Sequence, residues 1–195
     1  HLMSDLWNQP NQTFVSEVEK PNTVPETLTV DIDFKNVNVA DYAAVIMSAN
    51  YTSVRLRYFK PPKDAKGNEQ TITPDMVRRA PAVQFFARAM RNPKIVKGAL
   101  CHGLWLLTAM PELLSGRRVI CHEVVLADIA NAGGLYTPDP SNVVVDNDLV
   151  TGRSYQQTAE LVDRIRDAIL ANGKQNAIGT VPSKPVQPMH GGKKH

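Results

Sequence analysis

One stretch, residues 94–107 (KIVKGALCHGLWLL), most constrains how this chain can fold. Its first half consists of β-branched and small residues, which is typical of a strand buried on both faces of a parallel sheet. Its second half, with Leu104, Leu106 and Leu107, is typical of the packed side of a short helix. Cys101 stands at the junction and Gly103 follows two residues later. This order of strand, nucleophile, glycine and helix predicts a nucleophile elbow.

An elbow of this kind has two local consequences. The sharp turn forces Cys101 into a strained backbone conformation, and position 103 requires glycine because another backbone passes too close for a side chain. Cys101 would also lie at a helix N-terminus, where backbone N–H groups favour a thiolate over a thiol. The alternative is that Cys101 is an inert, buried small residue.

Composition bounds the class of protein. A chain of 195 residues fits one domain with a real core, and no run of 18 apolar residues could cross a membrane. The net charge of +3 is small, and its basic excess lies in the ends and in the 55–66 loop, which does not argue for nucleic acid. Two cysteines and no secretory leader suit a reduced protein. We therefore expect a cytoplasmic protein that binds neither nucleic acid nor membrane.

The chain divides into three parts by composition. We expect an irregular segment over 1–26, a folded domain over 27–171 and a flexible tail over 172–195. Within the domain, a long loop covers 51–73. Apolar patterning predicts strands over 28–34, 43–47, 118–122, 142–145 and 149–151, and helices over 74–90 with a break at Pro81, 124–132 and 155–170. Alternating strands and helices predict an α/β fold.

Residues 99–103, Ala-Leu-Cys-His-Gly, resemble the A-I-C-H-G signature of the ThiJ/PfpI family in the class I glutamine amidotransferase-like superfamily. Four further segments are similar to family segments in the same order, over 41–47, 114–119, 131–136 and 146–153. The resemblance runs from about Thr27 to about Leu170. It implies a flavodoxin-like three-layer α/β sandwich with a mainly parallel sheet, and assembly as a homo-oligomer.

Two departures from the family stand out. The early βαβ unit of the family, which supplies a glutamate that hydrogen-bonds the cysteine, has no match here. We therefore expect a truncated sheet that a second copy, or an N-terminal fragment, would complete. The family's Pro-Gly-Gly turn after the second strand reads Ser48-Ala49-Asn50 here. Asn50 tolerates positive φ, so the turn could still contribute to an oxyanion hole with the N–H of His102.

Candidate site residues lie beyond the carboxyl ends of the strands, where α/β sheets bind ligands. Cys101 is the candidate nucleophile, and His102 and His122 are the two imidazoles inside the fold. The resemblance implies that His102 is the base, oriented by a carboxylate from this chain or a neighbouring subunit, with His122 near the substrate. The sequence leaves open which histidine is the base, and His122 could instead be satisfied by the backbone.

The remaining candidate residues each allow two interpretations. Arg153 matches a family arginine near the pocket and could bind an anionic substrate group, or it could be tied to a structural carboxylate. Glu123 and Asp128 could orient an imidazole or lie in solvent. Adjacent Cys and His residues on a strand point to opposite faces, so we expect no zinc. No motif indicates a cofactor or metal.

Two functions follow. The first is a cysteine-nucleophile hydrolase or a glyoxalase- or deglycase-like enzyme, which attacks a carbonyl or amide carbon of a small molecule or peptide through Cys101. The second is a non-catalytic stress-response or redox-sensing homologue, in which Cys101 is oxidised to a sulfinate. A glutaminase subunit is least favoured, because the distal His-x-Glu expected near the C-terminus is missing.

Overall fold

The computed structural model describes residues 1–16, 18, 20–48, 51–58 and 60–173. At its centre is a four-stranded sheet with the order β3-β4-β8-β7, formed by Ala44–Met47, Val96–Leu100, Leu149–Gly152 and Val143–Asp146. The first three strands in this order run parallel, and β7 is antiparallel to β8. The fold is a flavodoxin-like α/β sandwich with a mainly parallel sheet, as the sequence predicts.

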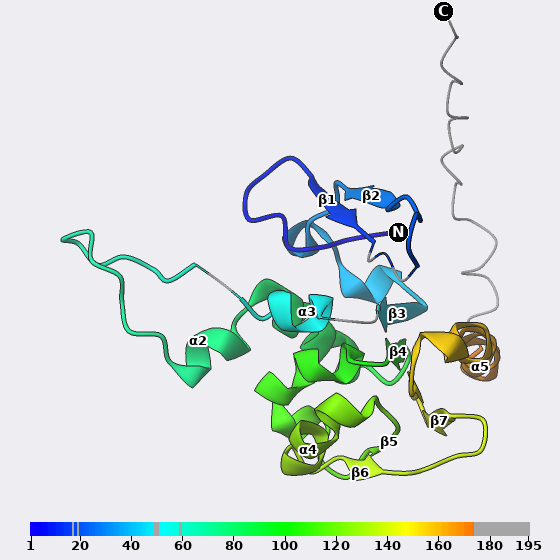
Figure 1. Ribbon diagram of the computed structural model, residues 1–195. Helices are drawn as coiled ribbons and strands as arrows, with labels where there is room; N and C mark the ends of the chain where they lie inside the picture. Colours follow the sequence, from blue (N-terminus) through cyan, green and yellow to red (C-terminus); the bar gives the residue numbers. More distant parts are fainter. Residues whose placement is uncertain (17, 19, 49–50, 59, 174–195) are drawn as a thin grey trace, which may run out of the picture.

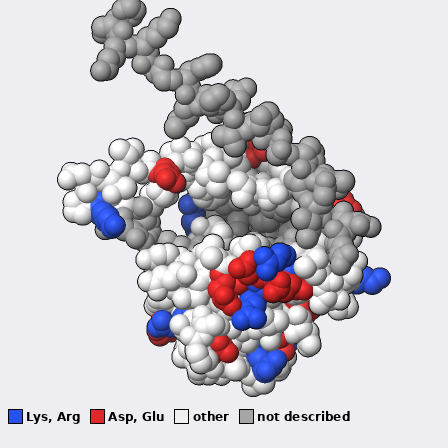
Figure 2. Space-filling model, turned by 90° about the vertical axis from the view of Figure 1, so that its right-hand side faces the viewer, with Lys and Arg blue, Asp and Glu red and all other residues white. Residues whose placement is uncertain are grey.

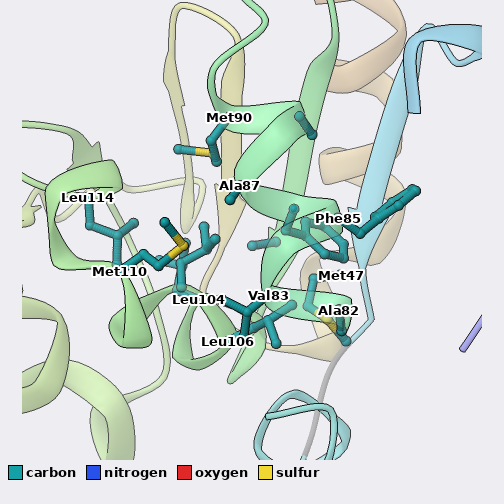
Figure 3. Close-up of a cluster of buried hydrophobic side chains, with 14 of the residues drawn as sticks. Met47, Ala82, Val83, Phe85, Ala87, Met90, Leu104, Leu106, Met110 and Leu114 are labelled. Carbon is teal, nitrogen blue, oxygen red and sulfur yellow. The ribbon is translucent and has the colours of Figure 1, made fainter. Parts of the chain in front are cut away.

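Helices cover both faces of this sheet (Figure 1). One face packs against α3 (Pro81–Met90) and the 3-10 helix η3 (Gly103–Ala109), and α4 (Glu123–Asn131) packs on η3 and β6. Figure 3 shows this cluster, in which Phe85, Met47, Leu104 and Leu106 meet. The other face packs against α5 (Thr158–Ala171), which completes three layers.

Strand β4 is the central element, and all five of its residues are buried. Its alternate residues face the two helical layers: Ala99 belongs to the cluster with α3, whereas Val96 and Leu100 belong to the cluster with α5. Gly98 allows α5 to approach, because a Cβ at that position would lie 2.5 Å from Ile165 Cδ1. Cys101 therefore follows a strand whose residues are all buried, as predicted.

Two small sheets flank the main sheet. In the first, β1 (Gln12–Val15) and β2 (Thr27–Val30) are antiparallel, so the expectation that 1–26 is irregular is wrong for β1. The strand expected over 28–34 ends at Val30, because Asp33 caps the 3-10 helix η1 (Phe34–Asn36). In the second small sheet, β5 (Arg118–Val119) runs parallel to β6 (Leu135–Tyr136) and is shorter than predicted.

The predicted helix over 74–90 is interrupted at Pro81, as expected. Thr73 caps α2 (Pro74–Arg78), and Pro81 starts α3, so the interruption at this proline is confirmed. The expected loop over 51–73 contains a short helix, α1 (Thr52–Arg55), which differs from the prediction. The other 3-10 helices are η2 (Val39–Asp41), η4 (Pro111–Leu113) and η5 (Tyr155–Gln157).

Strand β3 forms an edge of the main sheet, since no described strand pairs with its other side. Ile46 in this strand is 47% exposed. A mostly apolar cavity of about 570 Å³ lies between β3 and the N-terminal residues, with Leu28, Phe34 and Phe85 in its wall. The truncation of the sheet stays a prediction, and the expected tail lies outside the described residues from 174 onward.

The outer surface of α5 is covered with charges of both signs. Arg164 pairs with Glu160, and Arg166 pairs with Asp163 and Asp167. Figure 2 shows this face, where basic and acidic side chains alternate and do not form a patch of one sign. Among the described residues, no helix has the length and apolar character needed to cross a membrane.

Candidate functional site

Cys101 follows β4 directly and adopts a left-handed backbone conformation with φ of +59°. This region is unfavourable for residues with a Cβ, so the strained turn predicted for the elbow is present. The N–H of Cys101 donates to the carbonyl of Gly152 at 2.8 Å, which fixes the turn against β8. The thiol side chain is largely enclosed, with 9% of the residue exposed.

Gly103 has the role that the sequence predicts. A Cβ at position 103 would lie 3.1 Å from the carbonyl oxygen of Met47 at the end of β3. The glycine thus allows the elbow and β3 to approach each other. The helix that follows is a 3-10 helix, and its residues Leu104, Leu106 and Leu107 are buried.

His102 contacts the nucleophile directly. Its Nδ1 lies 2.9 Å from the Sγ of Cys101, which is within hydrogen-bond reach. The hydroxyl of Ser53 donates to the carbonyl of His102 at 2.9 Å, so α1 fixes the backbone of the histidine. His102 is 8% exposed, and its Nε2 is buried without a hydrogen-bond partner in the described part of the chain.

Three rings surround the His102 imidazole. The rings of Tyr51 and Trp105 lie with centroids 5.3 Å and 5.7 Å away, both tilted. The ring of His122 stacks on it at 4.9 Å with an interplanar angle of 18°. Burial lowers the pKa of His102, and the neighbouring His122 lowers it further. His102 is therefore neutral at neutral pH, which is the state that can accept a proton.

His122 has two contacts that define its position. Its Nδ1 accepts a hydrogen bond from the N–H of Val124 at 3.3 Å and so caps α4. The backbone N–H of His122 donates to the backbone carbonyl of Cys101 at 3.3 Å. The Nδ1 atom of His122 therefore has a backbone hydrogen-bond partner, as one of the two interpretations of this residue expects. Its ring also stacks on the candidate base, His102.

The acidic residues that we considered as orienting groups have other partners. Glu123 forms an ion pair with Arg153 and lies 3.6 Å from Nδ1 of His122. Asp128 accepts a hydrogen bond from Nε1 of Trp105 at 2.6 Å. Neither has a hydrogen bond or ion pair with His102. Arg153 is thus paired with a carboxylate of its own chain, the second of the two expected arrangements, and its contact with an anionic substrate group stays a prediction.

The second cysteine differs sharply from the first. Burial, with a smaller contribution from Cys101, raises the pKa of Cys121 to about 12. Cys121 is thus an uncharged thiol at neutral pH and a poor nucleophile. The cysteine, histidine and acidic residues of the described ranges form no cluster suited to a metal ion.

The backbone at the elbow offers a donor. Within the described residues, the N–H of His102 has no hydrogen-bond acceptor, and this group lies next to the nucleophile. It is in the position expected for one donor of an oxyanion hole. The second expected donor, in the turn containing Asn50, lies outside the described residues.

Sequence analysis missed three neighbours of the candidate base: Tyr51, Ser53 and Trp105. Trp105 follows His102 by three residues, and this spacing places two side chains on one side of a 3-10 helix. That signal was present in the sequence. Tyr51 and Ser53 reach the site only through the packing of α1 against η3, which local patterns do not indicate.

Comparisons with known proteins agree with this geometry. The family model of the DJ-1/PfpI family matches residues 71–167, which include the elbow, His102 and His122. The chain belongs to the DJ-1/PfpI family. The family motifs seen in the sequence point to the same family, so this membership rests on both the elbow and the match.

Solved structures of the DJ-1/PfpI fold resemble this protein at low sequence identity. A two-domain protein from Anabaena variabilis, with DJ-1/ThiJ/PfpI-like and ferritin-like domains, has a TM-score of 0.59 at 21% identity. The match covers 76% of this chain and 36% of that one, so this chain spans about a third of its length. A ThiJ/PfpI domain protein from Brachyspira murdochii has a TM-score of 0.57 at 13% identity, covering 75% and 70% of the two chains.

A third structure, DJ-1beta of Drosophila melanogaster, has a TM-score of 0.53 at 15% identity, and the match covers 76% of this chain and 71% of that one. At these identities the similarity supports the fold alone. The search of curated proteins found no relative by sequence.

Proposed function

We propose that this member of the DJ-1/PfpI family is a cysteine-nucleophile enzyme that attacks the carbonyl or amide carbon of a small molecule or short peptide. One observation carries the proposal: Cys101 is held in a strained turn with its Sγ 2.9 Å from Nδ1 of His102. A nucleophile in contact with a neutral base is the arrangement that covalent catalysis requires. Two reduced cysteines suit the cytoplasm as its compartment.

For an amide substrate the steps balance without a cofactor. The thiol proton passes to His102 as the Sγ–carbon bond forms, and the N–H of His102 stabilises the oxyanion. The carbon–nitrogen bond then breaks, and the leaving amine takes the proton from His102. Water hydrolyses the resulting thioester, with His102 as the base, and regenerates the thiol.

A 2-oxoaldehyde fits the same groups. The thiolate adds to the aldehyde carbon to give a hemithioacetal, and a proton moves from that carbon to the adjacent one to give a thioester. Hydrolysis releases a 2-hydroxy acid, so the net change is the addition of one water molecule. This route needs no charged anchor for the leaving group, and it therefore agrees with Arg153 being occupied by Glu123.

A redox-sensing role is the second candidate. It is favoured by the absence, among the described residues, of a carboxylate bound to His102, since such a group usually orients a catalytic imidazole. In this role one molecule of hydrogen peroxide would oxidise Cys101 to a sulfenic acid and a second would oxidise that to a sulfinate, and each peroxide would be reduced to water. The protein would then act in a stress response without turnover.

The test offers wild-type protein methylglyoxal and an activated amide, and follows 2-hydroxy acid or amine release by NMR. We expect turnover that Cys101→Ser abolishes and that His102→Gln reduces by about 100-fold or more. Cys121→Ser is the matched control, because the protonated Cys121 should contribute nothing. Absence of turnover, together with rapid sulfinate formation by peroxide in wild type, would replace the enzyme with the sensor.

A further inference from the structure

A second cleft, of about 460 Å³, has Trp105 in its wall. Its wall is formed by the segment from α1 to Arg57, by η3 and by α4. The ring of Trp105 contacts the cleft and also packs 5.7 Å from the ring of His102. Cys101 is not part of its wall, so this cleft is separate from the site described above.

Arg57 supplies a positive charge to the cleft. Its Nη1 donates to Oγ1 of Thr108 at 2.9 Å, and it forms no ion pair with any residue that the structure describes. Burial lowers the pKa of Arg57, and the negative charge of Asp128 acts in the opposite direction. A guanidinium has five N–H donors in a planar fork, so most of them remain for a ligand.

Asp128 supplies a negative charge to the same cleft. One of its carboxylate oxygens accepts from Nε1 of Trp105 at 2.6 Å, and the other oxygen makes no hydrogen bond to a described residue. Asp128 and Arg57 therefore interact through space without contact. Two opposite charges that face one cleft and do not pair leave room for a ligand that satisfies both.

We infer that this cleft binds a small zwitterion with the charge pattern of a free α-amino acid. Its carboxylate would accept two hydrogen bonds from the Arg57 fork, and its ammonium group would donate to Asp128. Val54, Pro111 and Ala132 provide an apolar wall for the side chain. The inference does not depend on the chemistry of Cys101, since neither Arg57 nor Asp128 has a role in it.

The indole N–H of Trp105 gives a direct readout, because it donates to Asp128 inside the cleft. Its NMR signal is identified by comparison with Trp7→Phe, which leaves one indole. We expect L-leucine to shift this signal in a saturable way, whereas N-acetyl-L-leucine and L-leucinamide, each with one charge, should bind about tenfold or more weakly. Saturation by N-acetyl-L-leucine at equal affinity would overturn the inference and leave a simple anion site.

A charge-removing variant tests the role of Arg57. Arg57→Gln should weaken L-leucine binding about tenfold or more by calorimetry, whereas Arg55→Gln, on the exposed side of α1, should leave it unchanged. Equal losses in both variants, or no loss in Arg57→Gln, would contradict the inference. Cys101→Ser should bind L-leucine as wild type does, so failure of the proposed enzyme activity is distinguishable from failure of this site.

Discussion

The imidazole of His102 stacks on that of His122 with ring centroids 4.9 Å apart and an interplanar angle of 18°. Two imidazoles this close disfavour a second positive charge, and the enclosure of His102 disfavours the first. The pKa of His102 is lowered for both reasons, with burial the larger. The base that touches Cys101 therefore stays neutral to a lower pH than an ordinary histidine.

This stack predicts a pH dependence. A base with a lowered pKa is active above that pKa and is lost as pH falls through it, so the acid limb should lie below about 6.5. His122→Asn removes the second imidazole but can still cap α4, since asparagine is a favourable cap. We expect the His102 NMR titration to move to higher pH in this variant. Glu123→Gln keeps both rings and is the control; an unmoved or lower pKa in His122→Asn would contradict the account.

Gly103 predicts a steric effect at the elbow. Gly103→Ala would place a Cβ 3.1 Å from the Met47 carbonyl oxygen, so β3 and the elbow must separate. We expect a loss of about 1–3 kcal/mol in the free energy of unfolding, with slower alkylation of Cys101. Wild-type stability and alkylation in Gly103→Ala would show that the close approach is unimportant.

We expect Lys97, which lies at the end of β4 away from Cys101, to contribute to the stability of the fold. This lysine is 1% exposed, its Nζ donates to the carbonyl of Asn92 at 3.2 Å, and it pairs with Asp148. Asp148 also pairs with Arg117 at 2.7 Å. Because Arg117 still compensates the carboxylate, Lys97→Met should cost about 1–3 kcal/mol of unfolding free energy in urea. Lys94→Met changes an exposed lysine and should alter the free energy of unfolding little. Equal losses in the two variants would show that the buried ion pair of Lys97 does not stabilise the fold.

The open edge of β3 predicts self-association. We propose that a second copy of this chain covers the apolar cavity beside the exposed Ile46, because parallel sheets are normally covered on both faces and at their edges. Light scattering should then give a mass above that of one chain. Ile46→Lys should shift the population toward monomer, whereas Ile72→Lys, equally exposed but outside the sheet, should not. A monomer in wild type at all concentrations would rule this out.

The elbow and its surroundings differ in how far the sequence predicts them. The buried strand, the strained Cys101 and the need for glycine at 103 follow from one short pattern, because the turn is local. The environment of His102 is not local: Tyr51 and Ser53 come from a helix about fifty residues earlier. The pairing of Arg153 with Glu123 likewise depends on the separation of β8 and α4 in space, which residue spacing does not define.

The reactivity of Cys101 tests the central claim most directly. Alkylation by iodoacetamide is measured against pH in wild type and in His102→Ala, with Cys121→Ser in both to remove the second thiol. The account predicts faster alkylation in wild type than in His102→Ala at neutral pH, because the neutral His102 accepts the thiol proton as the bond to Sγ forms. Equally slow alkylation in both proteins would contradict an activated nucleophile.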